Sequence, residues 1–316
     1  MGRCVAFRPA VGPWIVVLLT AMLAAGCQDG SVPNVITSPE GKPAYEGAKP
    51  PPTTPADPAV VVFKKQGGHP PYDLKVMDAD GSHVTTIYST TNINHGSPSW
   101  SPDGHSIAFY DRSDLWRIDV VLTNGVPTGA NLTPLLDRAT SVARPAWSPR
   151  GDLIAFLDIN LKTIEVIPAV GGPATVLYTY APASVWSLAW NRDGTQIAFS
   201  EGNAIRILTI GSGTVTTALG PEWGQQFGTP MELDWARTQE VLAFCAGAAT
   251  THNQAVYTLQ LPSGTPIFRA EGYYSTWSPD DSAILFQRQS LRKFFLATGL
   301  ITALGTSGEQ PDWRRF

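Results

Sequence analysis

The sequence predicts an all-β fold, a six-bladed β-propeller built from four-stranded sheets. Three observations predict it. A segment that contains one tryptophan recurs with a period just above 40 residues. Short apolar runs alternate with clusters of glycine, proline and aspartate, and no convincing helical periodicity follows residue 30. One set of three strands precedes the first recurring tryptophan, and a tryptophan strand with no followers ends the chain.

Each copy of the repeat joins an inner strand ending in tryptophan, a polar turn and a second strand resembling Ile-Ala-Phe. The spacings between the tryptophans are 47, 43, 45, 42 and 36 residues, which is the length of a four-stranded blade. At this fixed register the rings are interpreted as filling the gaps between blades, rather than as stacking sugars. The copies occupy residues 97–109, 144–156, 187–199, 232–244, 275–286 and 310–316, with Trp100, Trp147, Trp190, Trp235, Trp277 and Trp313.

The turn Ser-Pro-Asp-Gly joins the first two strands, because proline presets φ, aspartate bonds its own backbone and glycine accepts a positive φ. The fourth copy lacks Pro-Asp-Gly, and the fifth has Asp280 and Asp281 in place of Asp-Gly. The second strands contain near-continuous apolar runs, such as 154–157 and 241–245, as expected for sheets packed on both faces. Third strands are expected at 115–121, 163–169, 204–210, 255–261 and 293–297, and fourth strands at 132–136, 174–178, 214–219, 265–268 and 301–304.

The two ends of the repeat array complete one another. Strands at 59–63, 73–78 and 83–88 lack an inner tryptophan strand, and residues 311–316 supply one. We expect this C-terminal strand to pair with 59–63, the first N-terminal strand of blade one, and so to close the ring. Closure removes the exposed sheet edges that an open array would leave.

The first 26 residues read as a signal peptide with a positive start, a short apolar segment at 14–23 and small residues before Cys27. This pattern resembles the lipobox of bacterial lipoproteins, in which the cysteine thiol receives a diacylglycerol. The resemblance implies lipidation of Cys27, an extracytoplasmic location and attachment to a bacterial membrane. Because Gln28 follows the cysteine, the periplasmic face of the outer membrane is favoured if the host is Gram-negative. Residues 27–58 form a proline-rich linker that is expected to be disordered.

The segment Trp-Ser-Pro-Asp/Arg-Gly followed by Ile-Ala-Phe resembles TolB-like (WD40-like) propeller repeats, and the resemblance covers residues 59–316. It implies an envelope scaffold that binds proteins. The TolB N-terminal domain has no counterpart here, since the linker stands in its place, and a role in the Tol system is not implied.

The sequence carries no recognisable catalytic motif. The sequence contains no Gly-X-Ser-X-Gly nucleophile elbow and no His-Glu-X-X-His zinc motif, and its five histidines are scattered. We therefore expect no enzymatic activity, no catalytic or metal-binding residues and no cofactor. The net charge of −4 argues against nucleic acid. Cys245 is expected to be a buried, inert thiol, and Asp111, Asp158 and Glu201 are interpreted as solvated loop starts.

Function in propellers usually lies on the loops at one face, around the central channel. The loops that enter the inner strands carry aromatic and amide side chains suited to a protein or glycan partner. The candidate binding rim consists of Asn94, His95, Arg144, Trp186, Trp223, Gln226, Phe227, Tyr273, Tyr274 and Gln310.

The sequence therefore favours a monomeric, membrane-tethered scaffold for an unidentified envelope protein. The alternatives are a propeller that binds a glycan or small ligand, and a metal-dependent hydrolase or lactonase that uses the central channel.

Overall fold

A computed structural model of the chain describes residues 60–314 except 66, 68, 93–94, 137–140, 181–182 and 248–253. All of them belong to one compact unit, Val35–Phe316. The predicted signal peptide, Cys27 and the linker lie outside the described residues. No helix in the described part of the chain has the length and apolar character needed to cross a membrane.

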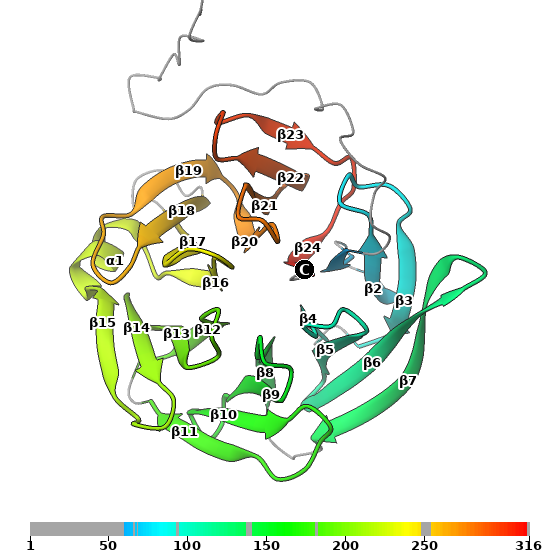
Figure 1. Cartoon of the computed structure of the whole chain (residues 1–316), viewed down its shortest axis with the longest axis horizontal. Helices are drawn as coiled ribbons and strands as arrows, with labels where there is room; N and C mark the ends of the chain where they lie inside the picture. The colour runs from blue at the N-terminus through cyan, green and yellow to red at the C-terminus, as the bar shows by residue number, and fades with distance from the viewer. Residues whose placement is uncertain are drawn as a thin grey trace, which may run out of the picture. The chain divides into compact units, whose positions relative to one another are not determined.

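Six four-stranded antiparallel sheets form a ring around a central channel (Figure 1). The predicted six-bladed propeller is thereby confirmed. We number the sheets as blades 1 to 6 in the order in which the chain builds them. Blade 1 contains β24 (Glu309–Trp313), β1 (Val61–Lys64), β2 (Tyr72–Met77) and β3 (Thr85–Thr90); blade 2 contains β4 (His95–Trp100), β5 (Ser106–Asp111), β6 (Asp114–Thr123) and β7 (Val126–Leu136); blade 3 contains β8 (Val142–Trp147), β9 (Leu153–Asp158), β10 (Thr163–Pro168) and β11 (Thr175–Thr179).

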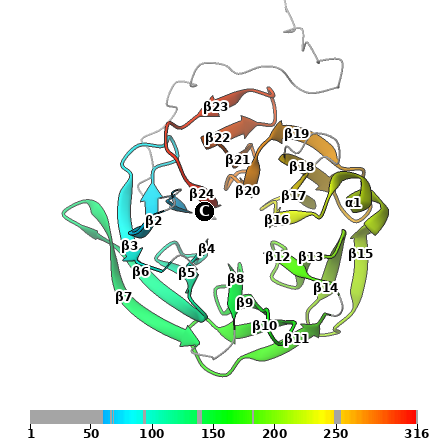
Figure 2. The same ribbon diagram turned by 180° about the vertical axis from the view of Figure 1, so that it is seen from behind.

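The second half of the ring repeats this arrangement, with each inner strand first and each outer strand last. Seen from behind, the same six inner strands surround the channel (Figure 2). Blade 4 contains β12 (Val185–Trp190), β13 (Gln196–Glu201), β14 (Ala204–Thr209) and β15 (Val215–Leu219); blade 5 contains β16 (Met231–Trp235), β17 (Val241–Gly247), β18 (Gln254–Gln260) and β19 (Ile267–Glu271); blade 6 contains β20 (Tyr273–Trp277), β21 (Ala283–Arg288), β22 (Ser290–Phe295) and β23 (Ile301–Ala303).

The ring closes as the sequence predicted. β24 lies between blade 6 and β1, and it pairs antiparallel with β1 through Val61 opposite Trp313 and Val62 opposite Asp312. The backbone N–H of Arg314 donates to the carbonyl of Val60 over 2.8 Å. Both ends of the described chain therefore belong to blade 1. Because β1 and β24 pair with each other, the inner edge of β1 is not left unpaired.

The blades are held together by apolar side chains on both faces of every sheet. The Ile-Ala-Phe triplets of the second strands, such as Ile107–Phe109 and Ile197–Phe199, are 0% exposed. All six repeat tryptophans are at most 5% exposed, so their interpretation as fillers between blades is confirmed. Burying one such side chain contributes about 1.5–3 kcal/mol, and the contribution requires a neighbouring blade on each side.

Polar contacts between inner strands add a second link from blade to blade. Asp312 Oδ2 accepts the backbone N–H of Trp100 over 2.7 Å. In the next blade Ser99 Oγ accepts the N–H of Trp147 over 3.0 Å. Asp234 Oδ2 in turn accepts the N–H of Trp277 over 2.7 Å. Inner strands lie too far apart to form a sheet, so these side chains satisfy backbone donors that would otherwise lack partners.

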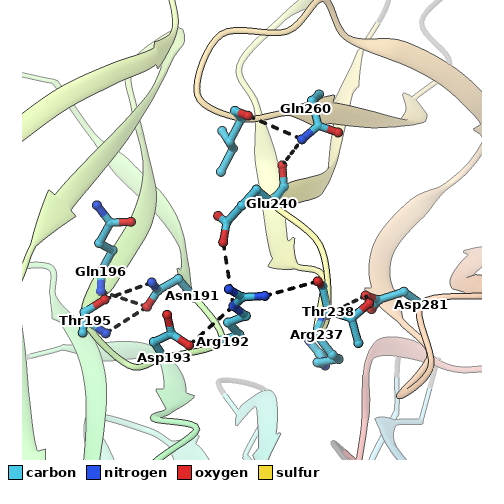
Figure 3. A network of polar contacts seen from close by, with 11 residues as sticks. Asn191, Arg192, Asp193, Thr195, Gln196, Arg237, Thr238, Glu240, Gln260 and Asp281 are labelled. Carbon is cyan, nitrogen blue, oxygen red and sulfur yellow. Dashed lines mark hydrogen bonds and ion pairs between the residues drawn. The ribbon is translucent and has the colours of Figure 1, made fainter.

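The two departures from the repeat turn compensate for one another. Asp281 occupies the glycine position of its turn with φ 56°. Its carboxylate accepts the backbone N–H groups of Arg237 and Thr238, each over 2.7 Å, and the hydroxyl of Thr238 over 2.6 Å. Figure 3 shows Thr238 and Asp281 at one end of a polar network that continues through Arg192 to Glu240. The turn that lacks Pro-Asp-Gly is thus held by the aspartate that replaces glycine in the next blade.

Three details differ from the sequence predictions. One of the loops expected to enter the inner strands, the one before β16, contains a short helix, α1 (Pro221–Phe227), which begins with proline in its first turn. The third strand of blade 6 is β22, shifted toward the N-terminus from the predicted 293–297 because the turn at Gln289 is very tight. In blade 2, β6 and β7 run for 10 and 11 residues and extend across β3 of blade 1 (Figure 1).

Replacing Asp281 with glycine restores the repeat consensus, yet we expect it to lower the free energy of unfolding by about 1–3 kcal/mol. The substitution removes the acceptor of three hydrogen bonds and relieves only the modest cost of one positive φ. Chemical denaturation measures the change. Gln289→Gly is the matched control, since Gln289 also has a positive φ (64°) but is exposed. A stabilised Asp281→Gly variant would contradict the compensation.

Candidate functional site at the channel mouth

Each inner strand carries a β-bulge just before its tryptophan. The pairing register shifts between Gly96 and Ser99 in β4 and between Tyr273 and Thr276 in β20. Three other inner strands shift at the equivalent place, and β12 shifts one residue earlier, between Val185 and Leu188. The residue three positions before the tryptophan lies inside every bulge. Bulges redirect side chains and are frequent beside functional sites. We call these six residues the channel ring: Ser97, Arg144, Ser187, Glu232, Tyr274 and Gln310.

Five members of the channel ring have a left-handed backbone although none of them is glycine. Such a conformation costs on the order of 1–3 kcal/mol for each residue and persists only where the surrounding structure imposes it. Ser187 is the member without a positive φ. The φ angles are 44° at Ser97, 55° at Arg144, 52° at Glu232, 57° at Tyr274 and 51° at Gln310.

The channel ring encircles a narrow cavity. Three consecutive residues from each of the six inner strands line this cavity, beginning with the six ring members. Its volume is about 90 Å³. One water molecule needs about 10–15 Å³, whereas pockets for drug-sized ligands measure about 300–1,000 Å³. The channel therefore has room for water and small groups but not for a drug-sized ligand.

A charged pair lies across the ring. Arg144 Nη1 and Glu232 Oε1 are 2.5 Å apart, and their side chains are 22% and 18% exposed. Burial by itself would lower the pKa of Arg144, but the Glu232 carboxylate, together with Tyr110 and Tyr274, outweighs it, so the pKa is raised. Burial, with Glu232 and Glu309 nearby, raises the pKa of Tyr274 to about 12. At neutral pH the mouth thus presents a charged guanidinium at Arg144 and a protonated phenol at Tyr274.

Deeper in the channel the acidic side chains are engaged by the protein. Asp234 receives both Nη atoms of Arg237, over 2.9 and 3.1 Å, and the hydroxyl of Thr276 over 2.9 Å. Asp312 accepts the N–H of Trp100, as described above. Within the described ranges, no three His, Cys, Asp or Glu side chains come together in a way that could hold a metal ion.

Two exposed aromatic side chains flank the ring. Trp186 is 46% exposed and Tyr273 is 39% exposed. Each directly precedes a ring member, on an inner strand of blade 4 or blade 6. Tyr273 and Tyr274 lie with their ring centroids 6.2 Å apart. Half of the mouth therefore combines aromatic surface with the Arg144–Glu232 pair.

The residues of the predicted binding rim fall into distinct places. Arg144, Tyr274 and Gln310 line the channel together, and Trp186 and Tyr273 are exposed beside it. His95 is completely buried in β4, so its expected exposure on the rim is wrong. Asn94 lies outside the described residues.

The remaining rim residues belong to α1. Trp223 packs against Phe227, Phe244 and Tyr257 with centroid distances of 4.7, 5.4 and 5.2 Å. Trp223 and Phe227 therefore anchor the helix to blade 5 instead of presenting a free aromatic loop. Gln226 is exposed on the helix.

The sequence reasoning missed three members of the channel ring, namely Ser97, Ser187 and Glu232. They could have been found, because every ring member stands three residues before a repeat tryptophan. That offset carried no recognisable chemistry, since the six positions hold five different residue types. The position becomes recognisable only in the structure, where a β-bulge brings each of the six residues to the channel.

The acids that end the second strands are not solvated loop starts. Asp111 is 8% exposed and accepts hydrogen bonds from Tyr88 Oη and Asn92 Nδ2, each over 2.5 Å. Asp158 is 0% exposed, and its Oδ1 accepts the backbone N–H groups of Asn160 and Leu161 over 3.0 and 2.8 Å. Glu201 accepts the hydroxyl of Tyr178 from blade 3 over 3.1 Å. The interpretation was wrong because tyrosines about 20 residues away desolvate or bond these carboxylates.

Cys245 conforms to expectation. Its side chain is 0% exposed, and burial raises the pKa of the thiol to about 12. A thiol that stays protonated and buried is a poor nucleophile.

Comparison with known proteins places these features in context. No protein-family model matches the chain. The Tol-Pal system protein TolB of Alcanivorax borkumensis is 44% identical over 54 residues, which is 17% of this chain and 12% of that protein. The Tol-Pal system protein TolB of Histophilus somni (strain 129Pt) is 42% identical over 48 residues, 15% of this chain and 11% of that protein. The matched segment is thus about an eighth or less of these relatives' length.

Solved structures share the fold over most of the chain. TolB from Acinetobacter baumannii aligns with a TM-score of 0.63 and 16% identity, over 81% of this chain and 66% of that one. The structure titled putative TolB from Agrobacterium tumefaciens aligns with a TM-score of 0.59 and 15% identity. The alignment covers 80% of this chain and 90% of that one. A chain of the nidogen/laminin complex aligns with a TM-score of 0.64 and 12% identity. The alignment covers 81% of this chain and 98% of that one. The chain therefore resembles TolB propellers in architecture and in a short repeat region.

Between pH 10 and 12 we expect the free energy of unfolding to fall, and to fall less in a Tyr88→Phe variant. Burial and the bond to Asp111 raise the pKa of folded Tyr88 to about 12, against about 10 when unfolded. The unfolded tyrosine therefore loses its proton first as the pH rises, which favours unfolding. Urea denaturation across this range measures both curves. They should run parallel below pH 9, and equal slopes above pH 10 would contradict the assignment.

Proposed function

We propose that this chain is a protein-binding scaffold of the bacterial cell envelope, tethered to a membrane through a lipid on Cys27. The observation that carries the proposal is the channel mouth, where the exposed Trp186 and Tyr273 each directly precede a member of the channel ring that also contains Arg144. Tryptophan, tyrosine and arginine are the residues that dominate binding energy in protein interfaces. Here they project from strands of a closed ring, so little conformational freedom is lost on binding.

The comparisons support a binding role without extending over the whole chain. TolB, which the repeat region resembles, carries the name of a Tol-Pal system protein. One solved propeller of the same architecture comes from a complex of two proteins, nidogen and laminin. We infer a protein partner of this chain from the chemistry of its own channel mouth, together with these likenesses.

The proposed location follows from the first 27 residues. A signal peptide followed by Cys27 favours export and lipidation, and each buried lipid methylene contributes about 0.8 kcal/mol to membrane attachment. The proline-rich linker would hold the propeller away from the bilayer. In a Gram-negative host the periplasmic face of the outer membrane is the proposed site, and the propeller acts there as a monomer.

We propose binding rather than catalysis at the channel. A channel hydrolase would need carboxylates available to a substrate or a metal, whereas Asp234 accepts hydrogen bonds from Arg237 and Thr276. Glu232 is likewise engaged by Arg144. A glycan is the alternative partner for the exposed aromatic rings, and the capture experiment below distinguishes it from a protein.

A photoreactive phenylalanine analogue at position 273 of the full chain should cross-link one discrete protein in cells. The matched control is position 170, because Val170 is 81% exposed but lies in the turn after β10, at the opposite end of the strands. Immunoblotting identifies the products. Adding Trp186→Ala to the cross-linking chain should lower the yield at least about tenfold, as expected for the loss of an interface anchor. Equal capture from both positions, or an undiminished yield, would contradict the proposal.

Replacing Cys27 with serine should move the chain from the membrane fraction to the soluble fraction. The serine hydroxyl cannot receive the thioether-linked lipid, so the tether is lost. Cell fractionation measures the distribution, and Cys4→Ser is the control that should leave the chain in the membrane fraction. A Cys27→Ser chain that still sediments with membranes would exclude this tether.

A further inference from the structure

The hairpin of β6 and β7 is the longest pair of outer strands in the described ring. Its strands have 10 and 11 residues, whereas the third and fourth strands of the other blades have between 3 and 7. Figures 1 and 2 both show the end of this hairpin projecting beyond the rim of the ring, beside blade 1. We call residues 121–126 the hairpin tip. The extra length therefore carries the hairpin tip past the packing that covers the other outer strands.

Below its tip the hairpin is fixed against blade 1. A Cβ on Gly129 of β7 would overlap the carbonyl oxygen of Ile87 in β3, so a larger residue would force the two strands apart. Pro127 is buried, and Val120 packs against the apolar cluster between blades 1 and 2. These contacts hold the base of the hairpin, and the tip projects from it in one orientation.

The hairpin tip exposes apolar side chains on both of its faces. Val121, Leu122 and Val126 are 41%, 60% and 49% exposed. Successive residues of a strand point to opposite faces, so Leu122 shares the face of Val120 and Val121 lies on the other. Val126 pairs with Thr123, which shares the face of Val121. A flat protein surface would cover one face of the tip, whereas lipid surrounds a tip that enters it.

The polar groups of the hairpin permit a shallow apolar environment. The hydroxyls of Thr123 and Thr128 lie 2.9 Å apart, and Thr128 Oγ1 also donates to the carbonyl of Val121 over 3.3 Å. No charged side chain occurs at residues 120–136, so no charge has to leave water with the tip. The amide of Asn124 limits the depth to the bilayer interface, where headgroups and water remain within its reach.

The proposed lipid tether makes a bilayer the large apolar surface nearest to this hairpin. Residues 28–59 separate Cys27 from Val60, which leads into β1 of blade 1, the blade that the hairpin crosses. A flexible chain of this length has a root-mean-square span of about 30 Å. The linker thus sets how far the propeller can stand from the bilayer, and it leaves the hairpin tip within reach of the surface.

The hairpin tip and the channel mouth lie at opposite ends of the strands. In every blade the channel-ring residue lies near the start of the inner strand, and the antiparallel second strand returns the chain to that end. β6, a third strand, therefore starts at the end of the mouth, and the turn after it lies at the other end. A surface that receives the tip leaves the mouth open to a partner.

We propose that the hairpin tip docks at the interface of the lipid bilayer to which the chain is tethered, with Val121, Leu122 and Val126 among the upper acyl chains. The proposal rests on the lipid tether of Cys27 proposed above and adds a second contact, which orients the propeller with its mouth away from the bilayer. Three apolar side chains bind a bilayer weakly by themselves. The tether keeps the bilayer at a high effective concentration, so weak docking is sufficient.

The test measures depth at single positions of the full chain. An environment-sensitive fluorescent amino acid is incorporated at position 122 and, as the matched control, at position 267, since Ile267 is 53% exposed on β19 of blade 5, across the ring from blade 2. The purified chain is reconstituted with phosphatidylcholine vesicles whose acyl chains are brominated near the headgroup. Emission from position 122 should fall at least about twofold relative to unbrominated vesicles, because an interfacial segment lies about 5–10 Å inside the headgroup boundary. Emission from position 267 should not change.

Two matched variants and one change of lipid assign the contact. Val121→Asp should reduce the quenching at position 122 at least about fivefold, because a carboxylate would have to leave water. Ile267→Asp adds the same charge to an exposed apolar site on the far side of the ring and should leave the quenching unchanged. Added phosphatidylglycerol should not raise the quenching, since the tip has no basic side chain. Thermal melting shows that each variant remains folded.

Flotation of the chain with the vesicles reports the tether separately, so the two proposals fail in different ways. Quenching at position 122 that Val121→Asp removes and Ile267→Asp does not supports docking. A chain that floats while position 122 stays unquenched keeps the tether and overturns docking, and unquenched emission from a chain that does not float overturns docking as well. A blue shift that grows with protein concentration in the absence of vesicles would assign the tip to a second copy of the chain, which also overturns the proposal.

Discussion

The burial of both faces of every blade is the constraint on which the rest of the structure depends. A sheet whose second strand is fully buried, as Ile107–Phe109 is in blade 2, needs a neighbour on each side. No linear array can meet this need at its ends, and β24 meets it by completing blade 1 beside β1. Because Trp313 and Val61 face one another across that junction, the two ends of the described chain are stabilised together.

Closure into a ring also creates the candidate site. Six inner strands converge on one axis, and the bulge in each turns the residue before Pro, Leu or Ser toward that axis. A left-handed backbone at Arg144 or Tyr274 would be unfavourable in an isolated strand. The packed ring imposes it, and the side chains at the mouth are thereby held in fixed positions. Rigidity of this kind favours binding of a partner's surface over the movement that a closing active site needs.

The six junctions between blades are not equivalent, although the repeats that form them are similar. Between blades 5 and 6, Asp281 holds a turn that lacks its own stabilising residues. Between blades 4 and 5 the turn at Arg192 forms looser contacts with Glu240 and Thr238, and a groove remains there. Differences in sequence between the repeats thus change the structure locally, and the polar contacts differ from one junction between blades to the next.

The sequence by itself determined the blade count, the closure of the ring, the buried tryptophans and the inert Cys245, because turn residues and apolar runs act over short distances along the chain. It placed Arg144, Trp186, Tyr273, Tyr274 and Gln310 near the channel for the same reason. Only the tertiary structure decided that His95 is buried, that Asp111 bonds Tyr88, that Trp223 anchors a helix and that Glu232 faces Arg144. These contacts join residues from different elements of secondary structure, and two of the three cross from one blade to another. No periodicity within one repeat specifies which side chain of another strand or blade will meet it.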